Sequence, residues 1–379
     1  MRPRAVVQYT DTVAFGGAEQ VLLHLLRTLD RDRWRPLLLH HDAPCLQPLL
    51  EGADAAGIER HRVAPIRGPR GIAAVPSFVR ALNALKPAVF HAHLNWPLGC
   101  SGGILAAALS RVPAVVATVH LFSGFPRAAT IPLQRRVVPR LVGRYIAVSE
   151  AVVRDIERGL GVPRTRIRCV PNGIAVDAFE RGTAADPAVR RQATGDTGRP
   201  TVVTLARLDR HKGLGTLLQA AALLPDVTFV IAGEGPERHR LEAEARALGV
   251  SERVSLPGFQ RDPARLLASA DVFVLPSLLE GHPLSVLEAM AAGTPVVATS
   301  IPGTAEIVSH GVTGVLVPPG NPAALAAAVK ELLEDRALAE RLAIAGRELV
   351  RRRFTAGAMT RSVANVYEEL LAERGTVRV

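Results

Sequence analysis

The sequence predicts an α/β protein built from two doubly wound parallel-sheet domains in tandem. Short runs rich in β-branched residues alternate with helical stretches along the chain, which is typical of βα units around a parallel sheet. Most of these runs are apolar without alternation, so helices should cover both faces of each sheet. The chain has 379 residues, more than one hydrophobic core usually supports, which favours two domains.

The N-terminal half contains the first set of elements. A helix is expected over 18–29, where apolar residues recur at helical spacing from Val21 to Leu29. The strands expected around it cover residues 5–9, 36–40, 88–93, 114–120, 145–149 and 167–173. A polar, Gly- and Pro-rich segment over 180–200 then indicates a domain linker.

The same alternation restarts after the linker. Strands are expected over 201–207, 227–233, 253–258, 272–277, 295–299 and 314–320, with helices over 214–224, 236–249 and 263–270 between them. A long final helix over 355–375 has Thr355 as a candidate N-cap. We therefore expect an N-terminal domain over 1–185, a C-terminal domain over 186–354, and a terminal segment over 355–379 that packs back on the N-terminal domain. Ligands should bind in the cleft between the domains, at the carboxyl ends of the strands.

Composition argues against several classes of protein. No apolar run reaches the roughly 18 residues that suggest a membrane span, and the basic start of the chain lacks the apolar core of a signal peptide. The three cysteines lie far apart, which favours reduced thiols over disulfides or a zinc site. Aromatic residues make up 4% of the chain and no nucleic-acid recognition motif is present. We expect a cytoplasmic protein without a nucleic-acid partner.

The net charge of +11 is unevenly distributed. Residues 1–190 contain 25 Lys and Arg against 14 Asp and Glu, whereas the rest of the chain contains 21 of each. No acidic residue occurs between Glu59 and Glu150. A GC-rich genome also enriches arginine, but it does not explain the missing acids. A one-sided basic region typically contacts an anionic partner, such as a membrane surface, a phosphate or a nucleic acid.

Two carboxylates, Glu280 and Glu288, stand in the otherwise apolar or small stretch EGHPLSVLEAMAAGTPVVAT. Glu280 should lie in the loop after an expected strand. A short helix should follow, with Pro283 in its first turn, Ser285 as a possible cap and Gly293 at its end.

The backbone amides of Gly281 to Leu284 would then be exposed at the positive end of this helix, which suits an anion or a hydroxyl. The two carboxylates suit sugar hydroxyls, because hydroxyls are strong donors to an ionised acceptor. The alternative is a solvated Glu280 and a local salt bridge at Glu288.

The stretch LARLDRHKGL places two cations before a helix. Arg207 ends a strand and Lys212 precedes Gly213, so the pair suits a pyrophosphate, although ordinary surface charge would also explain it. In IAGEGPERHRLE, Gly233 and Gly235 would allow close backbone approach at a strand–turn–helix junction.

Other candidates lie in the N-terminal half. Gly16 and Gly17 could present amides to a phosphate, although FGGAEQ is not the GxGxxG of a dinucleotide site. His120 is expected at a strand's carboxyl end, facing the cleft, where a packing role is the alternative. His91 and His93 are taken to lie on opposite sides of a strand, and no acid clusters with them, which argues against a metal site.

Taken together, the chain resembles retaining GT-B glycosyltransferases of glycosyltransferase family 4 over nearly its whole length. The family's motifs occur in order: GGAE, VHLF, VPNGI, ARLDRHKG, AGEGPE, the E-x7-E pair EGHPLSVLE, AAGTPVVAT, GTAEIV and GVTGVLVPPGN. Their joint order and spacing are more specific than any one motif. The resemblance implies two Rossmann-like domains that face each other across a cleft.

The resemblance also implies roles for matching residues. Arg207 and Lys212 would hold the donor phosphates, Glu288 the ribose hydroxyls, and Glu280 with the amides after it the donor sugar. His120 would contact the sugar near the reacting carbon. The implied catalytic set is His120, Glu280, Arg207 and Lys212. The implied donor-binding set is Gly16, Gly17, Arg207, Lys212, Gly233, Glu280, Gly281, His282, Pro283, Leu284 and Glu288. The implied acceptor-binding residues are His93 and Phe122.

Two departures from the family's motifs stand out. The usual PNGID is PNGIA here, with Asp177 two residues beyond Ala175, so the hydrogen bonding of this loop should differ. His282 follows Gly281 where the family often has Phe or Leu, which could change which sugar fits.

The implied activity is a hexosyl transfer from a nucleotide diphosphate sugar, with UDP favoured over GDP, that retains configuration and needs no cofactor or metal. The implied acceptor is a lipid, a lipid-linked group or a glycan in cell-envelope or polysaccharide biosynthesis. Residues 120–144 mix apolar and arginine side chains, which suits peripheral binding to an anionic membrane at its inner face. A soluble enzyme with a solvated arginine face, a soluble small-molecule acceptor, and a nucleotide-sugar epimerase of the same architecture are the alternatives.

Overall fold

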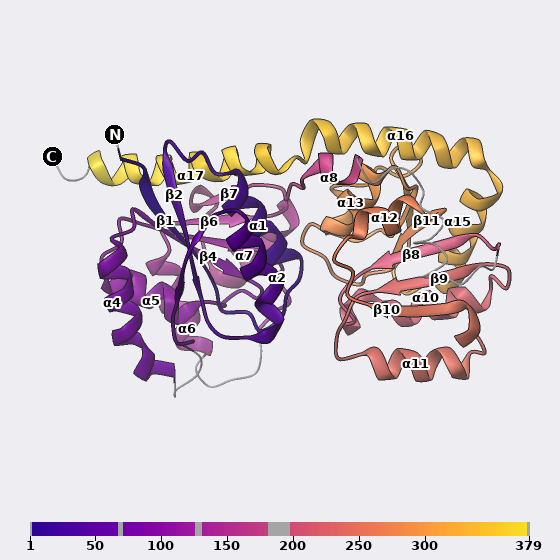
Figure 1. The fold of residues 1–379 in the computed structure, drawn as a ribbon, viewed down its shortest axis with the longest axis horizontal. Helices are drawn as coiled ribbons and strands as arrows, with labels where there is room; N and C mark the ends of the chain where they lie inside the picture. The colour runs from indigo at the N-terminus through magenta and orange to yellow at the C-terminus, as the bar shows by residue number, and fades with distance from the viewer. Residues whose placement is uncertain (1, 67–70, 126–130, 181–197, 377–379) are drawn as a thin grey trace. The chain divides into compact units, whose positions relative to one another are not determined.

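The chain forms two compact units, which Figure 1 shows in a computed structural model. The structure describes residues 2–66, 71–125, 131–180 and 198–376. Unit 1 comprises residues 1–173 and 356–379, and unit 2 comprises residues 174–355.

The chain passes from unit 1 to unit 2 between Gly173 and Ile174 and returns between Thr355 and Ala356. The expected domain boundary between residues 185 and 186, and most of the expected linker over 180–200, lie outside the described residues.

Unit 1 is built on a seven-stranded parallel sheet with the order β3-β2-β1-β4-β5-β6-β7. Its strands are β1 (Arg4–Thr10), β2 (Trp34–His40), β3 (Glu59–Arg62), β4 (Val89–Leu94), β5 (Ala114–Val119), β6 (Arg144–Ala147) and β7 (Ile167–Cys169). The strand order reverses between β1 and β4, which makes their carboxyl ends the topological switch point of this sheet. The predicted doubly wound fold is confirmed for this unit.

Two strands differ from the sequence expectation. β3 was not predicted, because its sequence ERHR contains no apolar residue and it lies at the sheet edge with exposed or half-buried side chains. β7 is shorter than the expected 167–173, and it ends at Cys169 before the PNG turn.

The helices of unit 1 follow ordinary start and stop signals. They are α1 (Gly17–Thr28), α2 (Gln47–Ala55), α4 (Val75–Leu85), α5 (Ser101–Leu109), α6 (Ile131–Leu141), α7 (Glu150–Leu160) and α17 (Ala356–Thr376), with the 3-10 helices η1 (Pro44–Leu46), η2 (Ile72–Ala74) and η3 (Arg164–Arg166). In α7, for example, the Ser149 hydroxyl accepts from the Val152 N–H, and Gly161 ends the helix at φ +65°. The final helix α17, yellow in Figure 1, packs against α1, β5 and β6.

Unit 2 repeats the architecture with six parallel strands in the order β10-β9-β8-β11-β12-β13. Its strands are β8 (Thr201–Leu205), β9 (Thr228–Ala232), β10 (Val254–Gly258), β11 (Val272–Leu275), β12 (Val296–Thr299) and β13 (Val315–Val317). Its helices are α8 (Val176–Glu180), α10 (Leu214–Ala222), α11 (Arg238–Ala247), α12 (Pro263–Ala268), α13 (Leu284–Ala292), α14 (Pro302–Ala305), α15 (Pro322–Glu334) and α16 (Arg336–Arg353), with η4 (Arg210–Lys212) and η5 (Ser251–Arg253).

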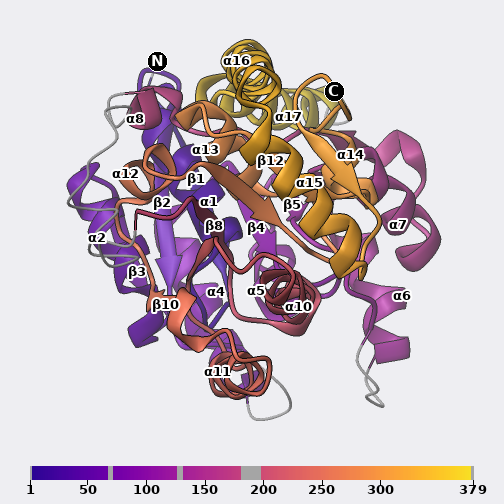
Figure 2. The same cartoon turned by 90° about the vertical axis from the view of Figure 1, so that its right-hand side faces the viewer.

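Helices cover both faces of this sheet, as the apolar strands require. Helices α12 and α13 pack together on one face, and α10 and α15 pack together on the other (Figure 2). The sheet order reverses between β8 and β11, so the loops after these two strands meet at the switch point of unit 2. None of the helices in the described part of the chain combines the length and apolarity that crossing a bilayer requires.

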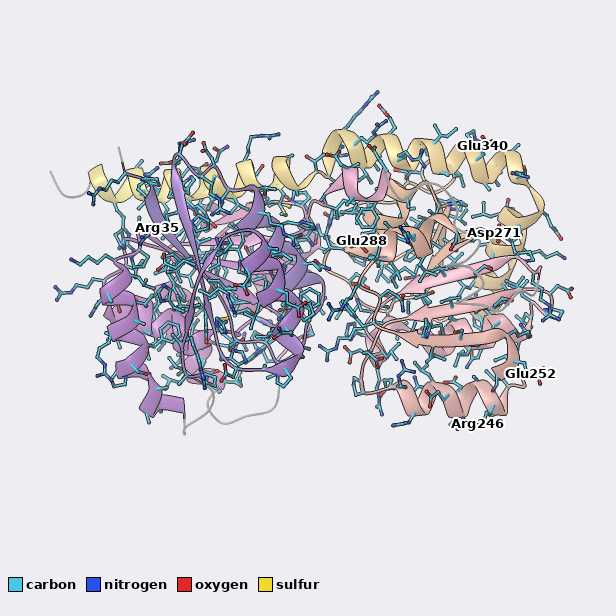
Figure 3. The ribbon with its side chains drawn as sticks, viewed as in Figure 1. Arg35, Arg246, Glu252, Asp271, Glu288 and Glu340 are labelled. Carbon is cyan, nitrogen blue, oxygen red and sulfur yellow. The ribbon has the colours of Figure 1, made fainter. Side chains whose placement is uncertain are left out.

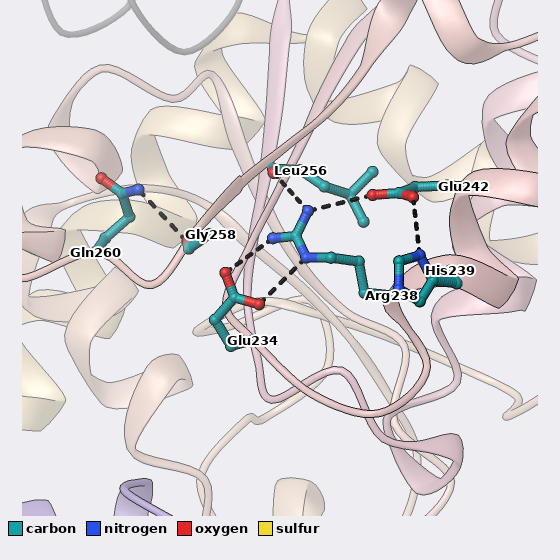
Figure 4. A network of polar contacts seen from close by, with 7 residues as sticks. All are labelled: Glu234, Arg238, His239, Glu242, Leu256, Gly258 and Gln260. Carbon is teal, nitrogen blue, oxygen red and sulfur yellow. Dashed lines mark hydrogen bonds and ion pairs between the residues drawn. The ribbon is translucent and has the colours of Figure 1, made fainter. Parts of the chain in front are cut away.

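A charged network holds the AGEGPE turn after β9 against β10 (Figure 4). Arg238 Nη2 is 3.0 Å from Glu234 Oε1, and its Nη1 donates to the Leu256 carbonyl at 3.1 Å and to Glu242 Oε1 at 3.3 Å. Each exposed ion pair contributes little to the free energy of unfolding. The network matters for position instead, because Arg238 joins Glu234 in the turn to the Leu256 carbonyl in β10.

Candidate active site

Glu280 and Lys212 form a buried ion pair in unit 2. Lys212 ends the 3-10 helix after β8, Glu280 lies in the loop after β11, and Lys212 Nζ is 2.7 Å from Glu280 Oε1. The Ser277 hydroxyl donates a 2.7 Å hydrogen bond to the same oxygen. The two charged side chains are 17% and 8% exposed, so neither is a solvated surface charge. The pair lies at the switch point of the sheet, where ligands bind in open α/β folds.

A glycine brings the two loops together. Gly213 has a φ of +65°, and a Cβ there would lie 2.0 Å from the Pro276 carbonyl oxygen. The Leu278 N–H also donates to the His211 carbonyl at 2.7 Å. Only glycine fits this conformation and this close approach. Gly213 therefore lets the segment that carries Lys212 pack against the loop that carries Glu280.

Arg207, the second predicted phosphate cation, has a different environment. Its side chain is 45% exposed, and its Nε is 2.8 Å from Asp209 Oδ2. Arg207 is therefore an accessible cation held by a neighbouring carboxylate, whereas Lys212 is buried in its ion pair.

The two glycines of the AGEGPE turn are explained by backbone packing within the protein. Gly233 has a φ of +147°, and a Cβ there would lie 1.9 Å from the Ala206 carbonyl oxygen. A Cβ at Gly235 would lie 2.5 Å from the Leu208 carbonyl oxygen. The close approach predicted for these glycines is thus made to the loop after β8.

The start of α13 differs in three respects from the prediction. Pro283 is the N-cap with extended dihedrals rather than a residue of the first turn, and no side chain caps the helix, so Ser285 does not act as a cap. Residues 281–284 are buried rather than exposed, and Pro283 has no N–H to offer. The predicted end is confirmed, since Gly293 closes the helix in the left-handed conformation at φ +76°.

Glu288 lies in the middle of α13, and Figure 3 labels it there. The side chain is half-buried, and among the described residues no group forms a hydrogen bond or ion pair with its carboxylate. Burial raises the pKa of Glu288 from 4.5 to about 7, because desolvation penalises the charged form. The two glutamates of the motif therefore differ, since Glu280 is paired within the protein and the Glu288 carboxylate is not.

His282 is a packing residue in this conformation. Its buried ring meets the Phe354 ring edge-on with the centroids 5.2 Å apart. Burial, with a smaller effect of the Arg353 charge, lowers the pKa of His282 to about 3. A contact of this neutral ring with a donor sugar remains a prediction.

In unit 1, His91, His93 and His120 form one cluster. The prediction that His91 and His93 lie on opposite sides of their strand is wrong, because residues two apart on a strand point to the same face. Their ring centroids are 4.4 Å apart, and the His93 ring stacks on the His120 ring at 5.3 Å. His93 Nδ1 is 3.0 Å from His120 Nε2. In the described residues, no group of three or more His, Cys, Asp or Glu side chains is arranged to hold a metal ion.

A side chain of the protein itself binds the Gly16–Gly17 turn, and the sequence did not predict this contact. The Gly16 N–H donates to Glu19 Oε2 at 2.9 Å, and Asn95 Nδ2 donates to Glu19 Oε1 at 2.9 Å. Glu19 is 2% exposed. The Gly16 amide, which was predicted to face a phosphate, is therefore already used by a buried carboxylate.

Phe122, the second predicted acceptor residue, lies against α7. A Cβ at Gly159 would lie 2.1 Å from Phe122 Cζ, so the absence of a side chain at Gly159 makes room for the half-buried ring. The Phe125 ring meets it edge-on at 5.6 Å. Phe122 thus has a packing role in this conformation.

Three residues near these sites were missed by sequence reasoning. Gln8 Oε1 is 2.8 Å from His93 Nε2, Tyr367 contacts His91 from α17, and Ser277 supports Glu280. Gln8 had a usable signal, because it is a polar residue inside an otherwise apolar strand. Tyr367 had none, since nothing in the sequence of the final helix indicates which strand it meets.

The final helix also supplies acids that the basic N-terminal region lacks. Its three glutamates pair with four arginines of unit 1. These pairs are Glu368 with Arg4 and Arg33, Glu369 with Arg168, and Glu373 with Arg144. Arg144 is itself buried, so it does not belong to the exposed basic surface predicted over 120–144. Arg127 of that segment lies outside the described residues.

Two family models match the chain. The model described as Glycosyltransferase Family 4 matches residues 15–178, and the model described as Glycosyl transferases group 1 matches residues 186–349. The two matches fall almost entirely in unit 1 and unit 2, respectively.

Individual relatives extend this similarity. The lipopolysaccharide core biosynthesis glycosyltransferase LpsE of Rhizobium meliloti is 35% identical over 53% of this chain and 54% of that protein, so the chain spans about half the length of this relative. The D-inositol 3-phosphate glycosyltransferase of Xylanimonas cellulosilytica is 33% identical over 74% of this chain and 72% of that protein. The crystal structure of Anabaena Alr3699/HepE in complex with UDP and glucose matches with a TM-score of 0.83 at 21% identity, over 97% of this chain and 100% of that one. This last likeness shows that the two chains share a fold.

Proposed function

This chain belongs to glycosyltransferase family 4, and we propose that it is a retaining, metal-independent hexosyltransferase that uses a nucleotide diphosphate sugar as donor. UDP is the favoured nucleotide and GDP the second candidate. The complex of Anabaena HepE with UDP and glucose supports this preference, because that protein has the same fold.

The observation that carries this proposal is the group of charged side chains at the switch point of unit 2. Lys212 and Glu280 are held together there, and Glu288 stands nearby along the same loop and helix as a carboxylate without a partner in the described chain. A partly buried carboxylate whose pKa is raised by desolvation is typical of a functional site. Ribose hydroxyls are suitable partners for Glu288, and sugar hydroxyls for Glu280.

The proposed chemistry follows from the leaving group. As the bond to the sugar breaks, negative charge develops on the nucleoside diphosphate, and Arg207 and Lys212 would stabilise it. These fixed cations would do the work that a metal ion does in other phosphate sites, so none is required. The acceptor hydroxyl would attack the same face of the oxocarbenium-like sugar and give its proton to the departing phosphate, and His120 would contact the sugar near the reacting carbon.

Thermal unfolding with UDP, GDP and a panel of their sugars tests the donor site. A ligand at about 100 times its dissociation constant adds about 2.7 kcal/mol to the stability of the protein. That corresponds to a rise in unfolding midpoint of several degrees. A shift with one nucleotide family would identify the base, and no shift with either would contradict the proposed donor site. An epimerase would convert the sugar of the donor in the absence of any acceptor. Turnover of the donor alone into an epimeric sugar would therefore favour that alternative, whereas turnover that requires an acceptor would exclude it.

For the acceptor, we propose a lipid, lipid-linked or glycan group in cell-envelope or polysaccharide biosynthesis. The charge of unit 1 supports an anionic partner, since it has 26 Lys and Arg against 14 Asp and Glu, whereas unit 2 has 20 against 21. The name of the Rhizobium meliloti relative places that protein in lipopolysaccharide core biosynthesis. The inositol phosphate in the name of the other relative supports a small soluble acceptor instead.

Helix α6 is the part of unit 1 that best fits a membrane surface. Leu133 and Val137 are 66% and 41% exposed and lie one turn apart, beside the exposed Arg136 and Arg140. Apolar and cationic side chains on one helix suit the interface of an anionic bilayer. Each cation near such a surface contributes on the order of 1 kcal/mol.

We expect the protein to co-sediment with phosphatidylglycerol-containing vesicles at low salt. Changing Arg136 and Arg140 to alanine should then weaken binding by about 10-fold or more, because about 2 kcal/mol of attraction is lost. The exposed Arg246 on α11 in unit 2, labelled in Figure 3, provides the control, and Arg246→Ala should bind as the unchanged protein does. Absence of binding to anionic vesicles would remove the membrane from this proposal.

A further inference from the structure

A continuous chain of hydrogen-bonded side chains crosses the interior of unit 1, from α17 to the residue after β5. Its members are all buried: Gln8, His91, His93, Thr118, His120 and Tyr367. Its contacts are Tyr367 Oη with Gln8 Nε2 at 3.1 Å and with His91 Nδ1 at 2.7 Å, His91 Nε2 with Thr118 Oγ1 at 2.7 Å, Gln8 Oε1 with His93 Nε2 at 2.8 Å, and His93 Nδ1 with His120 Nε2 at 3.0 Å. This series of hydrogen bonds therefore links Tyr367 of the last helix to His120, a predicted catalytic residue.

The side-chain amide of Gln8 sets the order of protons along one branch of this chain. Gln8 Oε1 can only accept, so His93 must carry its proton on Nε2 and donate. A neutral His93 then has its lone pair on Nδ1, which faces His120 Nε2. His120 consequently carries its proton on Nε2 and its lone pair on Nδ1.

The other branch follows the same direction. Gln8 Nε2 donates to the Tyr367 oxygen, so the Tyr367 hydroxyl can donate to His91 Nδ1, and His91 donates from Nε2 to the Thr118 hydroxyl. Burial lowers the pKa of His91 and of His120 to about 3, and that of His93 well below its usual value. All three rings are therefore neutral near pH 7, and each should be the Nε2–H tautomer.

The lengths of the contacts favour this order over its reverse. If the Gln8 amide were turned by 180°, every donor and acceptor would exchange, and the Tyr367 hydroxyl would have to donate to Gln8 Oε1 across 3.1 Å. Hydroxyl donors usually lie about 2.5–3.0 Å from an oxygen acceptor, whereas amide donors reach about 3.2 Å. The 3.1 Å contact therefore fits the amide as donor.

We propose that Tyr367, Gln8 and His93 are positioning residues that hold His120 in the Nε2–H tautomer, so that its Nδ1 accepts a hydrogen bond from a hydroxyl of the transferred sugar. The last step rests on the proposed function, whereas the tautomer is a property of the free protein. His120 Nδ1 is buried and has no hydrogen-bond partner among the described residues, which leaves an acceptor for a ligand. It is closed to solvent in this conformation, so a hydroxyl must displace the groups that cover it.

Tyr367 is well fixed for this role. Its ring meets Trp34 edge-on at 5.5 Å and His91 edge-on at 5.6 Å. The next two residues of α17, Glu368 and Glu369, form ion pairs with arginines of unit 1. The docking of α17 therefore determines where the phenol oxygen lies.

Nitrogen NMR of the full chain tests the tautomer directly. The protein has 11 histidines, and labelling their rings with nitrogen-15 allows a long-range proton–nitrogen correlation to show which ring nitrogen carries the proton. The signals of His120 and His93 are assigned from the spectra of His120→Asn and His93→Asn. We expect Nε2–H for His91, His93 and His120 at pH 7.5. An Nδ1–H tautomer at His120 would overturn the proposal without need of any further variant.

The variant Tyr367→Phe tests the role of the phenol oxygen. It keeps the ring but removes the group that orders Gln8 and His91, so His120 should change from one tautomer to a mixture. Tyr145→Phe is the matched control, because Tyr145 is also fully buried in unit 1 and its hydroxyl has no hydrogen-bond partner in the described chain. A single Nε2–H tautomer in folded Tyr367→Phe would contradict the role of Tyr367. If that variant does not fold, Gln8→Met removes the amide that holds the proton on His93 Nε2 and carries the same expectation for His120.

Calorimetry with UDP and with UDP-glucose separates this inference from the proposed function. Tyr367→Phe should weaken the binding of UDP-glucose in proportion to the fraction of His120 that leaves the Nε2–H tautomer, about twofold for an even mixture, and leave that of UDP unchanged. Equal losses for both ligands would contradict a role at the sugar. If the unchanged protein binds neither ligand, the proposed donor site fails and the sugar step fails with it, while the NMR result decides the positioning of His120.

Discussion

Replacing Glu288 with glutamine should weaken the binding of UDP about 10- to 100-fold and leave the protein as stable as before or more stable at pH 8. The loss of affinity is expected because a hydrogen bond to a charged group contributes about 1.5–3 kcal/mol. The gain in stability is expected because the carboxylate is desolvated without a partner among the described residues. Isothermal calorimetry and thermal unfolding on the same samples measure the two effects.

The stability effect has a definite dependence on pH. Burial raises the folded-state pKa of Glu288 to about 7, above its ordinary value of 4.5. Between these values the folded protein holds a proton that the unfolded chain has released, so the stability contributed by this group falls as pH rises from 4.5 to 7. The loss is complete above pH 7 and amounts to at most about 3 kcal/mol. Glu288→Gln should abolish this part of the pH dependence.

Binding gives an independent check on the same carboxylate. If ribose hydroxyls bind the ionised form, UDP should lower the pKa of Glu288 and release protons when it binds near pH 6.5. Calorimetry in two buffers of different ionisation enthalpy measures this release, which should be absent in Glu288→Gln. Glu252→Gln, at an exposed site of unit 2 labelled in Figure 3, is the control. Unchanged UDP affinity in Glu288→Gln would remove Glu288 from the donor site.

Replacing Lys212 with methionine should destabilise the protein by about 3–5 kcal/mol, because breaking one side of a buried ion pair leaves an uncompensated charge. Glu280 would retain only the Ser277 hydroxyl of its two partners. For a unit of this size the unfolding midpoint should fall by on the order of 10 °C. UDP affinity should also fall about 10- to 100-fold, since a charge-assisted contact to the phosphate is lost.

The double variant Lys212→Met, Glu280→Gln separates the two consequences. It removes both charges, so most of the lost stability should return, because replacing a whole buried pair is often neutral. UDP affinity should stay low, since the cation is still missing. A double variant that binds UDP as tightly as the unchanged protein would show that Lys212 serves only to neutralise Glu280.

Most of the fold could be predicted because the signals that specify it are local. Apolar runs such as 201–207 and 272–277 correspond to β8 and β11, and Gly293 ends α13 as its position indicated. The edge strand β3 escaped prediction, because its side chains do not enter the core and leave no apolar pattern. Boundaries were least accurate where a strand runs into a turn, as at the end of β7.

The candidate site was predicted in composition but not in its contacts. The motifs identified Lys212, Glu280 and Glu288. They did not predict the ion pair between Lys212 and Glu280. The Gly16 amide was assigned to a phosphate, although Glu19 uses it. His91 and His93 were predicted to lie on opposite faces of their strand, and this was wrong. Strand geometry alone places them on the same face, because side chains two residues apart on a strand point the same way.

The sequence by itself determined the two doubly wound sheets and the family, because hydrophobic periodicity and glycine punctuation act over a few residues, and it indicated candidate residues for a donor site. Only the tertiary structure decided which side chains meet. Glu280 reaches Lys212 because β11 pairs with β8 rather than with the strand before it in sequence. Tyr367 reaches the histidines because α17 returns to unit 1 and packs against its sheet. Such contacts depend on strand order and chain return, which local patterns do not encode.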